Sequence, residues 1–303
     1  MDRRDFLKGG LALGAGALAA GSALPAFARA AMQRGFRLKY APHLGMFEPL
    51  AGSDPIDQLQ FMADQGFTAF EDNDMAARPV ELQEAMARTM RDLGLTMGAF
   101  VATRAFGDTT FVSSDGGSAE KVLADVRQAT EVAERVGAAW CTVALGGCHR
   151  ELEQAHQAGS AAELLKRCAG ICEPSGLVMV LEPLSFEGRL GTVMSGVSHA
   201  YTLCRAVGSP SCRALFDIHH QQVTEGNIIA SIDRAWDEIA YFRIGDGPGR
   251  NEPTTGEINY RNVFRHIHAR GYAGLLGMDH GSSRPGADGA RAVLDAYVTC
   301  DSF

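Results

Sequence analysis

Short apolar runs alternate with amphipathic segments along most of this chain, and that alternation constrains its fold more than any other feature. Runs rich in β-branched and aromatic residues predict eight strands, at residues 36–41, 67–71, 95–101, 139–145, 177–182, 213–218, 239–244 and 274–279. Segments with apolar residues at helical spacing predict eight helices, near residues 55–65, 79–93, 118–136, 152–173, 195–207, 227–237, 259–270 and 286–297. In the segment 118–136 the apolar positions form one face, and Gly137 is expected to end the helix.

Eight β-α units in one chain of this length favour an α/β fold of the (β/α)₈ TIM-barrel type. The alternative is a doubly wound open sheet, which needs a phosphate-binding G-x-G-x-x-G turn if it holds a dinucleotide. The glycines at 245, 247 and 249 do not have that spacing and do not open a helix directly. We therefore expect a single barrel domain at residues 32–303.

Residues 1–31 are expected to lie outside the barrel. Arg3 and Arg4 precede an apolar run at residues 11–20, and small residues follow with an A-x-A pattern. This order is typical of a cleavable twin-arginine signal peptide, which predicts contact with the twin-arginine export machinery and a periplasmic location. The apolar run is short and rich in Gly and Ala, so no stable membrane anchor is expected.

The charge balance excludes several classes of partner. The formal net charge is −8 at pH 7, and no cluster of lysines and arginines interleaved with aromatic residues is present. Nucleic acids and anionic membranes are therefore poor candidates, and a small molecule is the expected ligand.

Polar residues end the last four predicted strands, where the functional side chains of a TIM barrel lie. These residues are Glu182, Asp217, Arg243 and Asp279. A carboxylate at the end of an apolar strand is costly to bury unless it is paired or coordinated. Three carboxylates and one arginine on adjacent strands therefore predict a functional site, with a structural ion-pair cluster as the alternative.

The segment 241–260 begins as a strand and continues as a polar loop with many Gly and Pro residues. Its part GPGRNEPTTGEINY resembles the corresponding loop of the hydroxypyruvate isomerase family, within the xylose-isomerase-like sugar isomerases and epimerases. Further similarity lies in VLEPLS at 180–185, FDIHHQQVTEGN at 216–227 and GYAGLLGMDH at 271–280. The resemblance covers essentially all of residues 32–303.

The resemblance implies a divalent-metal site and a pair of acid/base carboxylates at the ends of strands five to eight. The catalytic positions correspond to Glu182 and Asp279, and the metal positions to Glu182, Asp217 and Asp279. This chain departs from the family twice: Arg243 stands where relatives have glutamine or histidine, and Asp279 where they have glutamate. Arginine is always charged and has no lone pair for a metal.

Two accounts of the site follow from these departures. In the first, Arg243 replaces the metal and binds the substrate's oxygens, stabilising an enediolate without an ion. In the second, Mn²⁺ or Mg²⁺ is held by the three carboxylates and a histidine. Arg243 favours the metal-free account.

The remaining candidates are expected to bind substrate. His220 matches the family's D-x-x-H pattern, Arg250 and Glu252 lie in the signature loop, and Glu187 follows Glu182 by five residues. The resemblance predicts an isomerase or epimerase of a sugar or hydroxy-keto acid, acting through a carboxylate pair and an enediolate. A lyase or dehydratase acting on a keto-sugar and a non-catalytic periplasmic sugar-binding barrel are alternatives. A homo-oligomer is compatible with the resemblance, but no interface can be recognised in the sequence.

Overall fold

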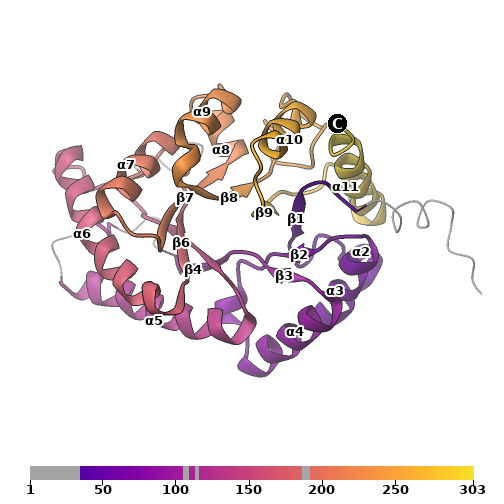
Figure 1. The fold of residues 1–303 in the computed structure, drawn as a ribbon, viewed down its shortest axis with the longest axis horizontal. Coiled ribbons are helices and arrows are strands. Elements are labelled where there is room, and N and C mark those ends of the chain that lie inside the picture. Colours follow the sequence, from indigo (N-terminus) through magenta and orange to yellow (C-terminus); the bar gives the residue numbers. More distant parts are fainter. Residues whose placement is uncertain (1–34, 105–108, 113–115, 186–191) are drawn as a thin grey trace, which may run out of the picture.

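The computed structural model describes residues 35–104, 109–112, 116–185 and 192–303. Its strands are β1 Lys39–Pro42, β2 Ala69–Phe70, β3 Thr96–Met97, β4 Phe100–Arg104, β5 Trp140–Ala144, β6 Val178–Leu181, β7 Cys212–Asp217, β8 Ile239–Arg243 and β9 Leu275–Met278. Its α-helices are α2 Glu48–Ala51, α3 Pro55–Asp64, α4 Val80–Leu93, α5 Gly116–Val136, α6 Gln154–Cys172, α7 Val197–Val207, α8 Ile218–Thr224, α9 Ile228–Ala235, α10 Tyr260–Ala269 and α11 Gly286–Cys300. Strands at the centre are surrounded by helices, as expected for a TIM barrel (Figure 1).

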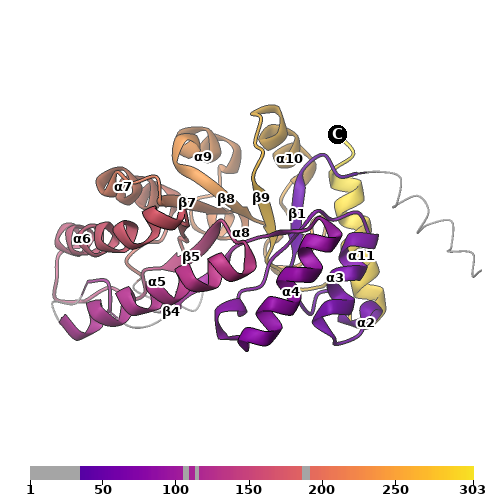
Figure 2. The same cartoon turned by 60° about the horizontal axis from the view of Figure 1, so that its bottom comes forward.

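The strands form a parallel ring. Seven of them pair in the order β1-β9-β8-β7-β6-β5-β4, and β2 and β3 pair separately. The gap on the β1 side is bridged where the Glu71 amide donates to the Pro42 carbonyl at 2.9 Å. On the other side β3 and β4 follow each other closely, so together they take the place of the single strand predicted at residues 95–101. Turned by 60°, the fold shows α11 beside α2 and α3, where the ring of helices closes (Figure 2).

Helix ends follow local chemistry. Gly137, in the left-handed region at φ 70°, follows the end of α5 as predicted. The short helix α8 was not predicted, and the sequence reasoning assigned its first residue to the preceding strand. Asp217 caps this helix, because its Oδ1 accepts from the His220 amide at 2.9 Å.

Side chains alternate between the two faces of each strand, so one set points into the barrel and the other set points outward to the surrounding helices. On β8, Phe242 faces the apolar layer under the helices, whereas Tyr241 belongs to a small buried cluster with residues such as Ala69, Val180 and Leu275. Arg243, two residues after Tyr241, is also buried, with 2% of its surface exposed. Small apolar residues thus fill part of the interior, and charged side chains occupy the carboxyl-terminal end of the strands.

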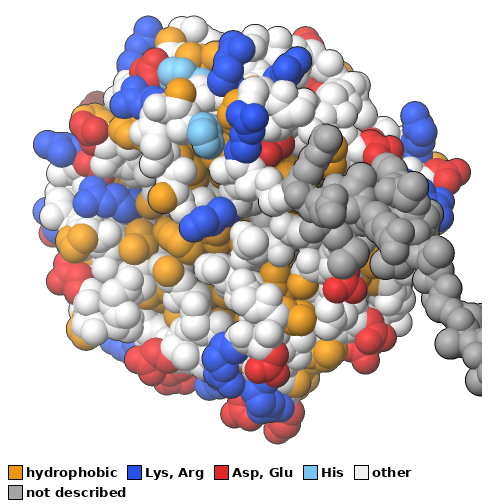
Figure 3. All heavy atoms as spheres, turned by 45° about the vertical axis from the view of Figure 1, so that its right-hand side comes forward, with side chains coloured by type: hydrophobic (Ala, Val, Ile, Leu, Met, Phe, Trp, Pro, Cys, Tyr) orange, Lys and Arg blue, Asp and Glu red, His pale blue; other side chains and the backbone are white. Residues whose placement is uncertain are grey.

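The surface agrees with the mixed charge of the sequence. On the face shown in Figure 3, acidic and basic side chains are interspersed. In the ranges that the structure describes, no helix combines the length and apolar character needed to cross a bilayer.

Candidate active site

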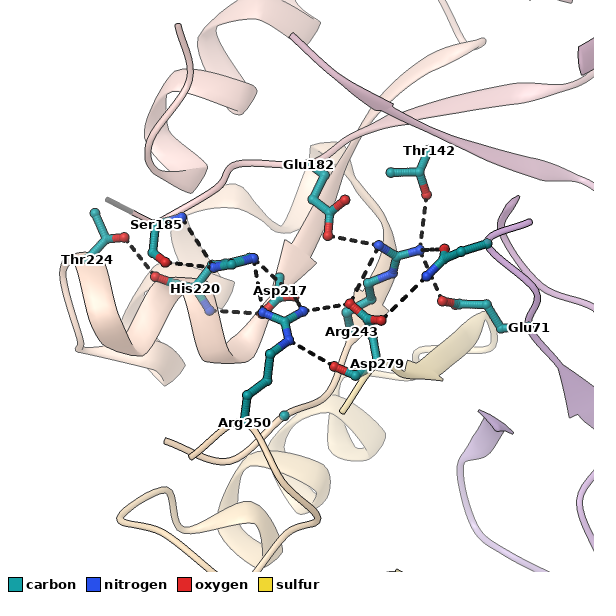
Figure 4. Close-up of polar contacts among 12 residues, drawn as sticks. Glu71, Thr142, Glu182, Ser185, Asp217, His220, Thr224, Arg243, Arg250 and Asp279 are labelled. Atoms are coloured by element: carbon teal, nitrogen blue, oxygen red, sulfur yellow. Dashed lines mark hydrogen bonds and ion pairs between the residues drawn. The ribbon is translucent and has the colours of Figure 1, made fainter. Parts of the chain in front are cut away.

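The four predicted strand-end residues lie together at the carboxyl-terminal end of the barrel (Figure 4). Asp217 and Arg243 are the last residues of β7 and β8, and Glu182 and Asp279 directly follow β6 and β9. Parallel strands end at the same edge of a sheet, so these four side chains converge although nearly one hundred positions separate the first from the last.

Arg243 is the buried cation of this cluster. Its Nη1 lies 2.8 Å from Oε1 of Glu182, and its Nη2 lies 3.0 Å from Oε1 of Glu71. Nη2 also donates to Asn73 Oδ1 at 2.6 Å and to Thr142 Oγ1 at 3.4 Å. Only 3% of the Arg243 side chain is exposed, so its guanidinium is used mainly to join groups inside the barrel.

Arg250 is the accessible cation, because 28% of its side chain is exposed. Its Nη2 donates to Asp217 Oδ2 at 2.9 Å and to Asp279 Oδ2 at 2.6 Å. Its Nε donates to the Asp279 carbonyl at 3.1 Å, and its Nη1 lies 3.0 Å from His220 Nε2. One loop residue therefore holds three site residues at once (Figure 4).

The signature loop is folded so that Arg250 points into the cluster. Asp246 is 1% exposed, and its carboxylate accepts from the Gly256 amide at 2.9 Å and the Ile258 amide at 3.1 Å. The Asp246 amide donates to the Asn251 carbonyl at 2.8 Å, closing the tip. Arg250 itself adopts φ 46°, a left-handed conformation that few non-glycine residues take. The many turn-forming residues of this loop thus fix one guanidinium.

His220 lies between Ser185 and Arg250. Arginine can only donate, and Nη1 of Arg250 lies 3.0 Å from Nε2 of His220. On the other ring nitrogen, Nδ1 accepts from the Ser185 amide at 3.2 Å and lies 3.0 Å from Ser185 Oγ. Ser185 and Arg250 thus contact the two ring nitrogens and fix the orientation of the ring.

The two arginines keep the neighbouring carboxylates ionised. Burial alone raises the pKa of Asp279, but Arg243 and Arg250 outweigh this effect and hold that pKa well below its ordinary value. The pKa of Asp217 is likewise lowered by Arg250 and His220 against the effect of burial. Both groups are therefore carboxylates at neutral pH.

Glu71 belongs to the same cluster, and the sequence reasoning missed it. It directly follows β2, is 1% exposed, and its Oε2 accepts from the Tyr241 hydroxyl at 2.7 Å. Gly277 makes room for it, since a Cβ at that position would lie 2.1 Å from Glu71 Oε2. Burial raises the pKa of Glu71 from 4.5 to about 7, although Arg243 lowers it. The signal that could have found Glu71 is the acidic residue ending the predicted strand 67–71.

Glu252, predicted to bind substrate, has another position. Glu252 is 1% exposed, and its carboxylate accepts from the amide and the hydroxyl of Ser283, so it fastens the loop after β9 instead of joining the cluster. Glu187 lies outside the described residues.

The residues only partly fit a divalent ion. Among the residues that the structure describes, Glu182, Asp217 and His220 offer ligand atoms that lie within 4.8 Å of one another. This group contains His220 in place of the predicted Asp279, whose Oδ2 is bound by Arg250. The facing atoms of Asp217 and His220 are also bound by Arg250, and Glu182 Oε1 by Arg243. The donors suit a metal, but in this arrangement a guanidinium lies among them.

Comparison with known protein families confirms the predicted signal peptide. A twin-arginine translocation signal sequence matches residues 1–20. This confirms that the chain is exported across the cytoplasmic membrane and places it in the periplasm. The domain boundary near residue 31 stays a prediction.

Two known isomerases are similar to this chain, one over most of its length and the other over less than half. The 2-oxo-tetronate isomerase of Cupriavidus necator is 26% identical over 247 residues, which cover 80% of this chain and 93% of that protein. The hydroxypyruvate isomerase of Escherichia coli is 30% identical over 128 residues, covering 42% of this chain and 49% of that protein. Both names agree with the resemblance carried by the loop 247–260.

Solved structures with a similar fold include a sugar epimerase. The 3-keto-D-glucoside 4-epimerase YcjR of E. coli superposes with a TM-score of 0.73 at 16% identity, covering 88% of this chain and all of that one. At this identity the similarity concerns the fold. A family model described as xylose isomerase-like TIM barrel matches residues 59–300. The chain belongs to the xylose isomerase-like TIM-barrel family.

Proposed function

We propose that the protein is a periplasmic isomerase or epimerase that moves a proton beside the carbonyl group of a small hydroxy-keto acid or sugar. The similar proteins named above are isomerases of 2-oxo-tetronate and hydroxypyruvate and an epimerase of a keto-glucoside. The observation that carries the proposal is the pair Glu182 and Asp279, which approach one guanidinium, Arg243 Nη1, at 2.8 and 3.8 Å. Paired carboxylates at the end of a barrel suit proton removal and return.

The two carboxylates are not equivalent. Asp279 is bound to Arg250 at 2.6 Å and has a strongly lowered pKa, so it holds a proton weakly. A general base must accept a proton from carbon and keep it until it is returned. We therefore assign proton removal to Glu182, which then carries the proton and returns it to the neighbouring carbon, while Asp279 stays an ionised carboxylate beside the two arginines.

When the proton is removed, negative charge develops on the substrate oxygen, and a positively charged group at the site can stabilise it. Arg250 is the partly exposed guanidinium, and preorganised donors of this kind stabilise an enediolate without needing to reorient. His220, with 16% of its side chain exposed, lies next to it and suits contact with a substrate hydroxyl. Arg243 supports the pair from the buried side. We favour this metal-free account over one with Mn²⁺ or Mg²⁺ held by Glu182, Asp217 and His220.

The periplasmic location favours a free sugar, a keto-sugar or a sugar acid as substrate. A lyase that expels a leaving group from the enediolate would use the same residues, and a binding protein would use them without proton transfer. These alternatives differ in what happens to the substrate, so the test follows the substrate itself.

The proposal is tested by incubating the mature protein in D₂O with hydroxypyruvate, 2-oxo-tetronates and a panel of ketoses and aldoses. Nuclear magnetic resonance is expected to show an isomeric product with deuterium beside the carbonyl for at least one compound. An elimination product would assign a lyase. Binding to one of these compounds without exchange or product, throughout the panel, would instead assign a binding protein.

A further inference from the structure

A pocket lies between the loop that follows β5 and the loop that follows β6, and we call it the β5–β6 pocket. Its volume is about 340 Å³, which is in the range of small-molecule sites. The same two strands contribute to the catalytic cluster, since Thr142 belongs to β5 and Glu182 directly follows β6. Ser195 lines this pocket and also a small cavity whose wall includes Asp217 and His220. The pocket is therefore next to the cluster.

Hydrogen bonds within and between the two loops hold the walls of the pocket in place. The side chain of Gln157 is buried, accepts from the His149 amide at 2.8 Å and donates to the His149 carbonyl at 3.1 Å. The Val193 amide of the second loop donates to the Gly146 carbonyl of the first at 3.1 Å. Defined contacts thus give the pocket a fixed shape before any ligand binds, which favours binding.

The β5–β6 pocket carries positive charge without a compensating carboxylate. No aspartate or glutamate is among the lining residues in the part of the chain that the structure describes, although the formal net charge of the protein is −8. Arg150 lines the pocket and is exposed, and its guanidinium has no ion-pair partner within the described ranges. A guanidinium of this kind is available to bind an anion.

Two further side chains of the pocket offer hydrogen bonds. Nδ1 of His149 accepts from the Glu151 amide at 3.3 Å, so the proton of the neutral ring lies on Nε2, where it can be donated. The Thr192 hydroxyl is buried and has no hydrogen-bond partner among the described residues. Because buried polar groups in proteins are nearly always hydrogen-bonded, this hydroxyl indicates a ligand or water in the pocket.

We propose that the β5–β6 pocket binds an anionic group at the far end of a substrate whose carbonyl lies at Glu182, and that Arg150 selects for this group. The inference rests on the proposed function and deepens it by naming a substrate class: sugar derivatives with a carboxylate or phosphate remote from the carbonyl. Both groups present paired oxygens that a guanidinium binds through two hydrogen bonds. A three-carbon acid such as hydroxypyruvate, with its carboxylate next to the carbonyl, would leave the pocket unfilled.

The test compares D-fructose, D-fructuronate and D-fructose 6-phosphate, which differ only at the end remote from the carbonyl. Isothermal titration calorimetry with the mature protein measures binding without requiring turnover. We expect the wild type to bind at least one of the two anionic compounds at least about fivefold more tightly than D-fructose, and this preference to weaken as ionic strength rises. Tighter binding of D-fructuronate assigns a sugar acid, and tighter binding of the phosphate assigns a sugar phosphate.

Arg150→Ala should lower the ratio of the anionic to the neutral affinity toward one, and Arg150→Lys should retain part of it, because lysine keeps the charge but not the paired donors. Arg291→Ala, which removes an exposed arginine paired with Asp288, should keep the wild-type ratio. Equal affinities in the wild type, no binding of either anionic compound, or a preference that persists in Arg150→Ala would overturn the inference.

These results are separable from catalysis. If the anionic compounds are preferred but none of them exchanges deuterium or gives a product, the proton transfer of the proposed function is refuted and the binding role of the pocket stands. If a compound is isomerised and an anionic group gives no preference, the pocket assignment alone is refuted.

Discussion

Arg243 and Glu182 form a buried ion pair, with Nη1 2.8 Å from Oε1 and only 3% and 6% of the two side chains exposed. The other guanidinium nitrogen lies 3.0 Å from Glu71, which is 1% exposed. One cation therefore compensates two carboxylates in the barrel interior. Since a buried charge without a partner is strongly destabilising, Arg243 has a structural task beyond any contact with substrate.

Arg243→Gln, which removes the buried charge and keeps a polar side chain, should lower the free energy of unfolding. Removing one partner of a buried ion pair costs about 3–5 kcal/mol, and Glu71 can offset part of this by taking up a proton. The loss should therefore be larger at pH 8 than at pH 5.5 in urea titrations. The double variant Arg243→Gln/Glu71→Gln should recover stability at pH 8, and equal stability of Arg243→Gln and the wild type at that pH would contradict the account.

The pH dependence of stability should carry a contribution from Glu71. Its pKa is raised from 4.5 to about 7 on folding, so between these values the folded protein holds a proton that the unfolded chain has released. This contribution is fully present below pH 4.5 and is lost as the pH rises through 7. One such group contributes a slope of at most about 1.4 kcal/mol per pH unit.

Urea titrations at pH 5, 6 and 7 measure this slope. Because burial lowers the pKa of His280 from 6.5 to about 4 and gives a contribution of opposite sign in this range, the quantity to compare is the difference in stability between wild type and variant. The stability advantage of the wild type over Glu71→Gln should decline as the pH rises, whereas its difference from Glu48→Gln, at an exposed position, should not change with pH. Asp217 and Asp279 act in the opposite sense, because their pKa values are lowered and their contributions disappear only in acid. A wild-type slope unchanged by Glu71→Gln would show that Glu71 does not titrate in this range.

Gly277→Ala tests the space reserved for Glu71. The new Cβ would lie 2.1 Å from Glu71 Oε2 and would displace the carboxylate. Overpacking of this kind costs about 1–3 kcal/mol, measurable as a lower urea midpoint. The matched control is Gly159→Ala within α6, where nothing lies within 4 Å of the added carbon. The control should gain roughly 0.5–1 kcal/mol, because alanine suits a helix interior better than glycine, and a Gly277→Ala protein as stable as the control would contradict the packing described here.

The order of strands and helices was predictable because the spacing of apolar residues indicates which face of each element is buried, and burial of these faces stabilises the elements. Each predicted strand from residue 36 onward corresponds to an observed one, apart from the division of 95–101 into β3 and β4. That division falls at Gly98, where a Cβ would lie 2.6 Å from the Tyr241 hydroxyl of β8. The strand is interrupted where Gly98 contacts Tyr241, a residue more than one hundred positions away. The apolar periodicity of residues 95–101 carries no information about such a distant contact.

The sequence predicted the site residues that end strands, but it did not predict the position of the side chain that the loop contributes. Glu182, Asp217, Arg243 and Asp279 were found because each ends an apolar strand. The position of Arg250 depends on hydrogen bonds around Asp246 and on an uncommon backbone conformation. Nothing in the local sequence states where such a guanidinium points.

The most direct test of the central claim is the exchange of solvent deuterium into substrate by the wild type and by Glu182→Gln. With the compound that the wild type converts fastest, wild-type exchange should be readily measured, and Glu182→Gln should reduce it by at least about 100-fold, because a positioned base contributes 10²–10⁴-fold. Glu238→Gln, at a buried carboxylate paired with Arg205 and Arg213 outside the cluster, serves as the control and should retain exchange. Full exchange by a folded Glu182→Gln protein would contradict the assignment of Glu182 as the base.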